Sequence, residues 1–326
     1  GYHESTPFNK GRDLRALAMK YIAGTGGLIK YGHSEVGNFT KGDLMYEQNE
    51  IEFLPTKMED AADQLIIAKW ILRTLAYQFG VDLTFAPKIT VGKAGSGLHI
   101  HTRLKKGDKN MMIENGKLTD SALKAIAGYL DLAPSLTAFG NTNPMSYFRL
   151  VPHQEAPTNI CWGDRNRSVL VRVPLGWTSG AGDMLRDANP LEKVEDQDFS
   201  GKQTVEFRCP DGSADVYLLI AGLAVAVRHG FEMKDALQYA KERYVDVNIF
   251  DDANKGVADR LSQLPASCYD SALCLEKQRA DFEKYGVFAP GLIDGLVTGL
   301  KKFDDKTLRQ DLGNDEVKIM ELVQKY

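Results

Sequence analysis

Apolar residues recur at helical spacing in several segments of the chain, most clearly in residues 57–79. There they return every three or four positions, which buries one face of a helix. Thr56 and Glu59 predict a capping box at its start, and Gly80 predicts its end. Similar patterns predict helices at residues 11–23, 121–132, 214–228, 271–285 and 307–326.

Strands are predicted where apolar and polar residues alternate, since successive strand side chains point to opposite faces. In residues 46–54, two glutamates alternate with Ile51 and Phe53, which indicates a half-buried strand with a carboxylate face. In residues 97–104, both histidines lie on the face opposite the leucines. Further strands are predicted at residues 28–36, 169–173 and 204–209, with a polar insertion at residues 38–47. Because helices and strands mix without βαβ regularity, the predicted fold class is α+β.

Composition places the chain among ordinary globular proteins. It has 326 residues, of which 43% are apolar and 26% charged, and its net charge is −4. The dispersed charges indicate neither a nucleic-acid partner nor a membrane surface, and the longest apolar run, residues 218–227, is too short to cross a bilayer. Residues 1–10 do not read as a signal peptide. The four cysteines match no zinc, redox or disulfide pattern, so we expect a reducing compartment, most simply the cytoplasm.

Four predicted strand faces carry residues that suit a divalent metal: Glu35, Glu50, His99 and Glu206. Hard cations such as Mg²⁺ or Mn²⁺ take carboxylate oxygens, with an occasional imidazole. The alternative is that these are solvated strand faces, and for any one residue taken alone the general exposure of charged side chains favours that alternative.

Arginines form a second group, with Arg149, Arg165, Arg167, Arg172 and Arg208 lying mostly in or beside strands. Buried arginines need an anionic partner, and phosphates and carboxylates fit the guanidinium fork. An internal salt-bridge network with Glu155, Glu206 and Asp211 is the alternative. The glycine-rich run at residues 92–97 could let backbone N–H groups approach an anion, but it is not a Walker sequence, and such runs are more often flexible loops.

Taken together, these segments resemble the glutamine synthetase family, of the bacterial type I kind. Residues 95–101, Gly-Ser-Gly-Leu-His-Ile-His, are similar to the family's ATP-site signature. Its longest shared stretch is matched at residues 149–152, 155–159, 165–168 and 172–174, and its next one at residues 205–211. Residues 35–36 and 48–51 resemble the paired metal-ligand strands. The matches follow the family's order from Gly1 to about Leu275.

The resemblance implies a role for each matched residue. Glu35 and Glu50 would hold one divalent metal, Mg²⁺ or Mn²⁺, and His99 and Glu206 a second. His101, Arg167 and Arg172 would line the phosphates of ATP, and Arg208 would contact the phosphoryl group in transit and the substrate side chain. Arg149 would bind the carboxylate of glutamate, with Gly95 lying against it. Glu155, on a mobile flap, would take a proton from the incoming ammonium.

The implied fold is the glutamine-synthetase catalytic domain over residues 1–326, a curved, mostly antiparallel sheet flanked by helices, with residues 290–326 as a divergent helical part. The implied reaction joins ammonia to the γ-carboxylate of glutamate through γ-glutamyl phosphate, with ATP as co-substrate, and serves nitrogen assimilation. The parent protein would be a large ring-forming homo-oligomer.

The chain also departs from the family's pattern. It lacks the small N-terminal domain and the strand with two more metal-binding glutamates, so we expect these 326 residues alone to show no ligase activity. Ala94 stands where an asparagine is common, Thr204 where a basic residue is frequent, and Phe250 where some bacterial members carry a regulatory tyrosine. Two alternatives stay open: a γ-glutamyl-amine ligase of the same family, which Ala94 and the insertion favour, and a non-catalytic family member.

Overall fold

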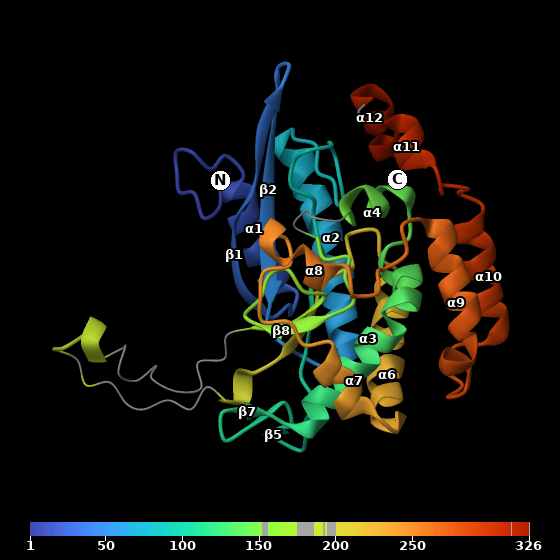
Figure 1. The fold of residues 1–326 in the computed structure, drawn as a ribbon. Helices are drawn as coiled ribbons and strands as arrows, with labels where there is room; N and C mark the ends of the chain where they lie inside the picture. The colour runs from blue at the N-terminus through green and yellow to red at the C-terminus, as the bar shows by residue number, and fades with distance from the viewer. Residues whose placement is uncertain (152–155, 175–185, 192, 194–199, 314, 326) are drawn as a thin grey trace.

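The computed structural model describes residues 1–151, 156–174, 186–191, 193, 200–313 and 315–325. It confirms the α+β prediction, with helices packed around short strands (Figure 1). The helices are α1 Arg12–Gly24, α2 Met58–Phe79, α3 Asp120–Gly140, α4 Pro144–Arg149, α6 Val216–Glu232, α7 Ala236–Glu242, α8 Lys255–Ala258, α9 Cys268–Glu283, α10 Pro290–Lys301, α11 Leu308–Leu312 and α12 Glu316–Lys325, with 3-10 turns η1 Ser200–Lys202 and η2 Asp252–Asn254.

Four short strands, far apart in sequence, form the central sheet. They are β3 Ile100–Thr102, β10 Val205–Phe207, β9 Val171–Val173 and β8 Trp162–Asp164, in that spatial order. The pairs β3–β10 and β10–β9 are antiparallel, whereas β9–β8 is parallel, so the sheet is mostly antiparallel. Two small hairpins flank it: β4 Lys105–Lys106 with β5 Lys109–Asn110, and β6 Ile113–Glu114 with β7 Lys117–Leu118.

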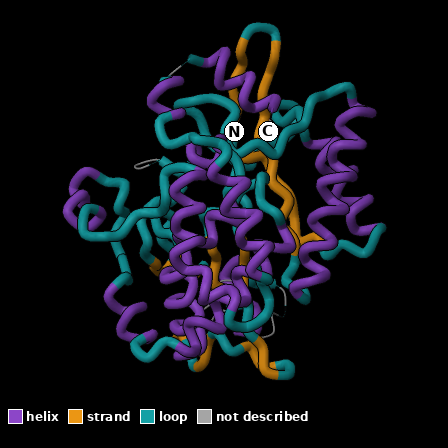
Figure 2. Tube along the Cα trace, turned by 90° about the vertical axis from the view of Figure 1, so that its right-hand side faces the viewer, coloured by secondary structure: helices purple, strands orange, loops and turns teal. Residues whose placement is uncertain are grey.

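A separate two-stranded sheet joins β1 Ile29–Lys41 to β2 Leu44–Phe53. The strands predicted at residues 28–36 and 46–54 are longer than predicted, because the polar insertion at residues 38–47 continues both of them through the pairs Asn38↔Glu47 and Lys41↔Leu44. Gly42, at φ 59, forms the tight turn between the strands, a backbone conformation that glycine adopts without strain. The hairpin projects beyond the body of the molecule in both views (Figures 1 and 2).

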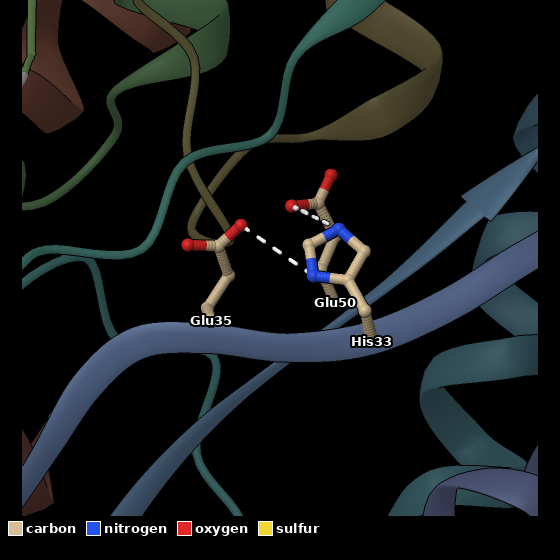
Figure 3. Close-up of side chains that lie close together, drawn as sticks. All are labelled: His33, Glu35 and Glu50. Atoms are coloured by element: carbon tan, nitrogen blue, oxygen red, sulfur yellow. Dashed lines mark ion pairs between the residues drawn. The ribbon is translucent and has the colours of Figure 1, made fainter. Parts of the chain in front are cut away.

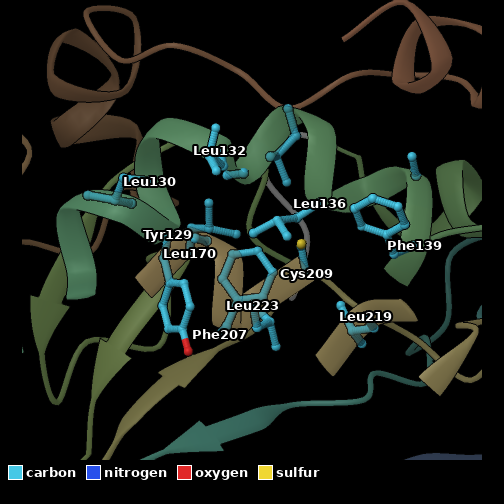
Figure 4. Packing of buried hydrophobic residues seen from close by; sticks show 14 of the residues in the cluster. Tyr129, Leu130, Leu132, Leu136, Phe139, Leu170, Phe207, Cys209, Leu219 and Leu223 are labelled. Carbon is cyan, nitrogen blue, oxygen red and sulfur yellow. The ribbon is translucent and has the colours of Figure 1, made fainter. Parts of the chain in front are cut away.

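The main core lies between α3, α6 and α9 and one face of the central sheet (Figure 4). The ring of Tyr129 on α3 lies 5.5 Å from that of Phe207 on β10, and its hydroxyl is 2.6 Å from Thr102 Oγ1 on β3. Helices α3 and α6 approach so closely that a Cβ at Gly128 would lie 1.9 Å from the carbonyl oxygen of Ala226. The packing of these helices therefore fixes the position of β3 and β10, which carry site residues.

Several helix boundaries differ from the prediction. Lys57 rather than Thr56 precedes α2, and no side chain caps it, so the capping box is absent; Gly80 ends the helix in the left-handed conformation, as predicted. Helix α3 continues past Pro134, since its buried face packs on α6 and α9. The predicted helix at 307–326 is divided into α11 and α12. Among the described residues no single helix could span a membrane, although the sharply bent pair α6 and α7 passes a test of length and composition.

Candidate active site

One cavity of about 1610 Å³ lies between the β1–β2 hairpin, the glycine-rich loop and the polar face of the central sheet. It is lined by every predicted site residue that the structure describes: Glu35, Glu50, Gly95, His99, His101, Arg149, Arg167, Arg172, Glu206 and Arg208. The predicted base, Glu155, lies outside the described residues. The sequence-based grouping therefore corresponds to a single concave region.

Glu206 is the centre of the sheet side of this cavity. In the strand register it lies opposite both His101 and Arg172, so the three side chains share one face. Its carboxylate is 1% exposed and lies 3.1 Å from His99 Nδ1, 2.5 Å from Arg172 Nε and 3.5 Å from Arg208 Nε. Burial alone would raise the pKa of Glu206, but the hydrogen bond from His99 and the nearby positive charges lower it to about 2. The carboxylate is therefore ionised at neutral pH.

These contacts bear on the salt-bridge alternative. Glu206 does pair with Arg172 and Arg208, as that alternative required. Asp211 accepts hydrogen bonds from Asn141 Nδ2 at 2.7 Å and from Ser213, and the charge of Arg149 opposes the rise in its pKa that burial causes. On the sheet side of the cavity the Glu206 carboxylate thus faces two guanidinium groups and one imidazole.

His99 offers a neutral imidazole beside this carboxylate. Desolvation inside the cavity lowers the pKa of His99 to about 4, against the opposing effect of Glu206. Gly97 makes room for the ring, since a Cβ there would lie 2.8 Å from His99 Nε2 and 2.5 Å from Arg149 Nη2. A neutral imidazole with an ionised carboxylate is a donor set that fits Mg²⁺ or Mn²⁺.

A second cluster lies on the β1–β2 hairpin, where His33, Glu35 and Glu50 bring their ligand atoms within 4.8 Å of one another (Figure 3). His33 Nδ1 is 3.8 Å from Glu35 Oε1, and His33 Nε2 is 3.7 Å from Glu50 Oε2. Burial, together with the Glu35 carboxylate, raises the pKa of Glu50 to about 7. Because a divalent cation would relieve this crowding of negative charge, the donor set again fits a metal ion.

His33 was missed by the sequence analysis. It is 7% exposed, and its ring stacks on His3 at 4.3 Å and on Tyr31 at 5.5 Å between ring centroids. The available signal was its position two residues before Glu35 on one strand, which places both on the same face. Glu35 and Glu50 also belong to a different sheet from Glu206, although all three line the cavity.

Arg149, which is predicted to bind the carboxylate of glutamate, is almost fully buried. It ends α4, which begins with Asn143 as cap and Pro144 in the first turn. Arg149 is 4% exposed and donates from Nη1 to the carbonyls of Cys209 at 2.7 Å and Pro210 at 3.2 Å, and from Nη2 to the carbonyl of Arg208 at 3.2 Å. Part of its donor capacity thus anchors the end of β10.

Arg208 and Arg167 lie at different depths. Arg208 is 7% exposed, and burial lowers its pKa to about 10; its Nη1 donates to the carbonyl oxygens of Arg167 and Val169. Arg167 is exposed to the cavity, so its guanidinium can reach a ligand. Arg165, in contrast, lines a different pocket and does not join this group.

The far end of the cavity is also basic. His101 Nδ1 lies 3.1 Å from Thr204 Oγ1, and desolvation lowers the pKa of His101. Lys30 and Arg103 line the same end, and Lys30 is 2.7 Å from Glu52. Neither was predicted, because a single basic residue on a strand carries no distinctive pattern. Thr204, which stands where the family often has a basic residue, contacts the imidazole of His101.

The fold and site together define an α+β domain in which two sheets present acidic, imidazole and guanidinium groups to one cavity. The chain belongs to the glutamine synthetase family, since the family model described as "Glutamine synthetase, catalytic domain" matches residues 1–319.

Curated relatives agree with this assignment. The glutamine synthetase of Pyrococcus furiosus is 32% identical over 287 residues, which cover 88% of this chain and 58% of the relative. That of Thermococcus kodakarensis is 31% identical over 325 residues, covering 98% of this chain and 65% of the relative. A crystal structure titled as a novel glutamine synthase homolog matches with a TM-score of 0.75 at 21% identity, covering 100% of this chain and 66% of that one. The chain therefore spans less than two thirds of these two curated relatives.

Proposed function

We propose that the chain is the catalytic part of an ATP-dependent ligase that joins ammonia to the γ-carboxylate of glutamate through γ-glutamyl phosphate. The observation that carries the proposal is the convergence of Glu206, His99, Arg172 and Arg208 at one face of the sheet, opposite the acidic cluster on the hairpin. A phosphorylated intermediate requires two anions to approach each other, and this cavity supplies fixed positive charge for that approach.

Two metal positions follow from the donor sets. Glu35 and Glu50, with His33 added by the structure, would hold one divalent cation, and His99 with Glu206 would hold the second. When bound, Mg²⁺ or Mn²⁺ supplies positive charge against the phosphate oxygens.

The remaining groups would bind and orient the reactants. Arg167, Arg172 and His101 would contact the phosphates of ATP, and Arg208 would neutralise charge on the phosphoryl group in transit. Arg149 would bind the carboxylate of glutamate, and Gly95 makes room for its side chain, since a Cβ there would lie 2.9 Å from Arg149 Cγ.

The last step needs a proton acceptor, because ammonium is not a nucleophile. We propose Glu155 for this role, on the resemblance of residues 155–159 to the family's motif. Two further proposals rest on the family resemblance alone: a ring-forming homo-oligomer for the whole protein, and little turnover by these 326 residues alone.

Ala94 favours one alternative, a γ-glutamyl-amine ligase. It lines the cavity beside Gly95. Its side chain is small and apolar, so it leaves room where an amine substituent could lie and makes no polar contact to substrate there. The metal and phosphate groups would serve both reactions equally.

Two measurements test the proposal. Calorimetric titration of the chain with Mn²⁺ and ADP should show binding that Arg172→Lys weakens and Arg228→Lys, on the surface of α6, leaves unchanged. In the whole protein, glutamate-dependent phosphate release should need ammonia, and Arg208→Lys should lower kcat by about a hundredfold. Phosphate release that ignores glutamate, or an unaffected Arg208→Lys variant, would overturn the proposal. A higher kcat/KM for methylamine than for ammonia would establish the alternative.

A further inference from the structure

A second pocket, of about 990 Å³, is lined by residues of β7, β8 and α7, which are labelled in Figure 1. We call it the sheet-back pocket, and its wall includes Trp162, Asp164, Val173 and Gln203. Asp164 pairs with Val173, and Trp162 with Val171, while Arg172 between them pairs with Gly163. Because neighbouring strand residues alternate between faces, Asp164 and Val173 lie on the face opposite Arg172. The pocket is therefore separate from the catalytic cavity, although Pro174 borders both.

Its wall combines an apolar base with aromatic rings. Leu118, Leu123 and Leu237 line it, and the rings of Trp162 and Tyr244 meet edge-on at 4.9 Å between centroids. Trp162 is anchored, since its Nε1 donates to the carbonyl of Ala240 at 2.6 Å, whereas Tyr244 is 41% exposed and free to contact a ligand ring. A concave apolar surface with a few polar groups at its rim is typical of small-molecule sites.

The rim carries an excess of positive charge. Lys117, Arg165 and Lys241 line the pocket and are exposed, against the single carboxylate of Asp164. Across the described ranges, none of these three cations forms an ion pair. The chain as a whole is negative, at −4, so three cations without ion-pair partners around one hollow point to an anionic ligand.

Arg165 adds an independent observation. Its φ of 55 lies in the left-handed region, which is unfavourable for a residue other than glycine. The conformation is held by the hydrogen bond from its N–H to the carbonyl of Val173 at 2.9 Å. Such strained residues cluster at ligand sites, where the backbone aims a side chain that an ordinary conformation would direct elsewhere.

We propose that the sheet-back pocket binds a small organic anion, a phosphate or carboxylate attached to an apolar ring. The ring would pack against Tyr244 and the leucines, and the anion would meet Lys117, Arg165 and Lys241 at the rim. The volume suits a ligand of this size. The proposal does not depend on the ligase reaction.

The test uses fluorine NMR on protein labelled with 5-fluorotryptophan, in which Trp162 reports on the pocket wall. The chain has three tryptophans, so each resonance is assigned by replacing one with phenylalanine. Phenyl phosphate and phenylacetate are titrated separately to identify the preferred anion. Benzyl alcohol and inorganic phosphate are the controls, the first a ring without charge and the second a charge without a ring. The Trp162 resonance should shift and saturate with one of the two anions, whereas that of Trp70, which is exposed on α2, should not move.

Variants then locate the anion contacts. Arg165→Gly together with Lys241→Met should weaken binding about tenfold, since charge-assisted contacts are lost. Glycine tolerates the φ of 55, so this variant should fold, and Lys117→Met provides a second, milder test. Lys234→Met, exposed and outside the pocket, is the matched control. An unmoved Trp162 resonance, equal binding of benzyl alcohol, or undiminished affinity in the double variant would overturn the proposal.

Discussion

The close contact between α3 and α6 predicts that a glycine-to-alanine substitution there destabilises the protein, whereas the same substitution at an open helix position stabilises it. Replacing Gly128 with alanine adds one methyl group on α3, 1.9 Å from the carbonyl oxygen of Ala226 and 2.8 Å from the backbone nitrogen of Gly230 on α6. A Cβ atom essentially never lies within 3.0 Å of an atom beyond its own residue and that residue's chain neighbours, and both atoms met here are backbone atoms that cannot rotate away. The two helices must therefore separate along their contact.

The magnitude follows from two opposing effects. Alanine favours a helix over glycine by roughly 1 kcal/mol. Overpacking a close contact costs about 1–3 kcal/mol and more when backbone must move, so we expect Gly128→Ala to destabilise the fold by about 2 kcal/mol. Gly295, in the middle of α10, has nothing within 4 Å of a Cβ, so only the helix preference applies and Gly295→Ala should stabilise by roughly 0.5–1 kcal/mol.

Urea unfolding followed by circular dichroism measures both variants under the same conditions. We expect the midpoint to fall for Gly128→Ala and to rise for Gly295→Ala. Since Tyr129, next to Gly128, packs on Phe207 of β10, the first variant should also weaken binding of Mn²⁺ with ADP. Stabilisation by both substitutions would refute the reasoning, because it would show that the helices adjust without loss.

Four other outcomes are expected. Glu206→Gln should lower the urea midpoint by an amount equivalent to about 3 kcal/mol, because buried positive charge loses its partner; an unchanged midpoint would show that these cations need no anion. Glu50→Gln should raise the melting temperature without metal and reduce the further rise that Mn²⁺ causes, and an undiminished Mn²⁺ effect would argue against a metal at the hairpin. A hydrogen bond from His229 lowers the pKa of Asp131, so the ionised carboxylate stabilises the fold above its unfolded pKa near 4, and this stabilisation is lost as the pH falls through the folded pKa. The difference in stability between the native chain and Asp131→Asn should therefore shrink on acidification. A difference that stays constant with pH would contradict this linkage. Mass spectrometry after treatment with an adenylylating enzyme and ATP should find no AMP on the segment around Phe250, which lacks a hydroxyl; AMP there would contradict the expectation.

Two exposed carboxylates provide the controls for these variants. Glu276→Gln breaks a surface ion pair with Lys301 at 2.8 Å, and Asp13→Asn breaks one with Arg12 at 3.2 Å. Exposed pairs contribute little to stability, so both substitutions should leave the midpoint and its pH dependence close to those of the native chain.

Helical periodicity was the most reliable signal in the sequence. It placed α2 and α6 within a few residues, because long amphipathic segments average over many side chains. Short strands were harder: β8 has three residues and is defined by its pairing with β9, which lies near it only in the folded chain. The hairpin extension at residues 38–47 was not recognised as strand because Leu44 and Met45 are exposed like their polar neighbours, so the alternation that identifies a half-buried strand is missing.

The site was predictable where alternation and residue type agreed. His99 and Glu206 were each placed on the polar face of a predicted strand, and the structure brings them to 3.1 Å. His33 was missed because one histidine on a strand resembles a buried core residue. The backbone contacts of Arg149 could not be predicted either, since they depend on the carbonyls at the end of β10, 59 to 61 residues away in the chain.

The strand order of the central sheet also constrains how the protein is made. Ile100 on β3 pairs with Phe207 on β10, so the two halves of the sheet can meet only after the ribosome has delivered the later strand. Closing so long a loop is slow, and until then β3 presents an unpaired edge in the nascent chain. Completion of the central sheet must therefore wait until β10 has been translated, and chaperones that shield exposed strands would act in this interval.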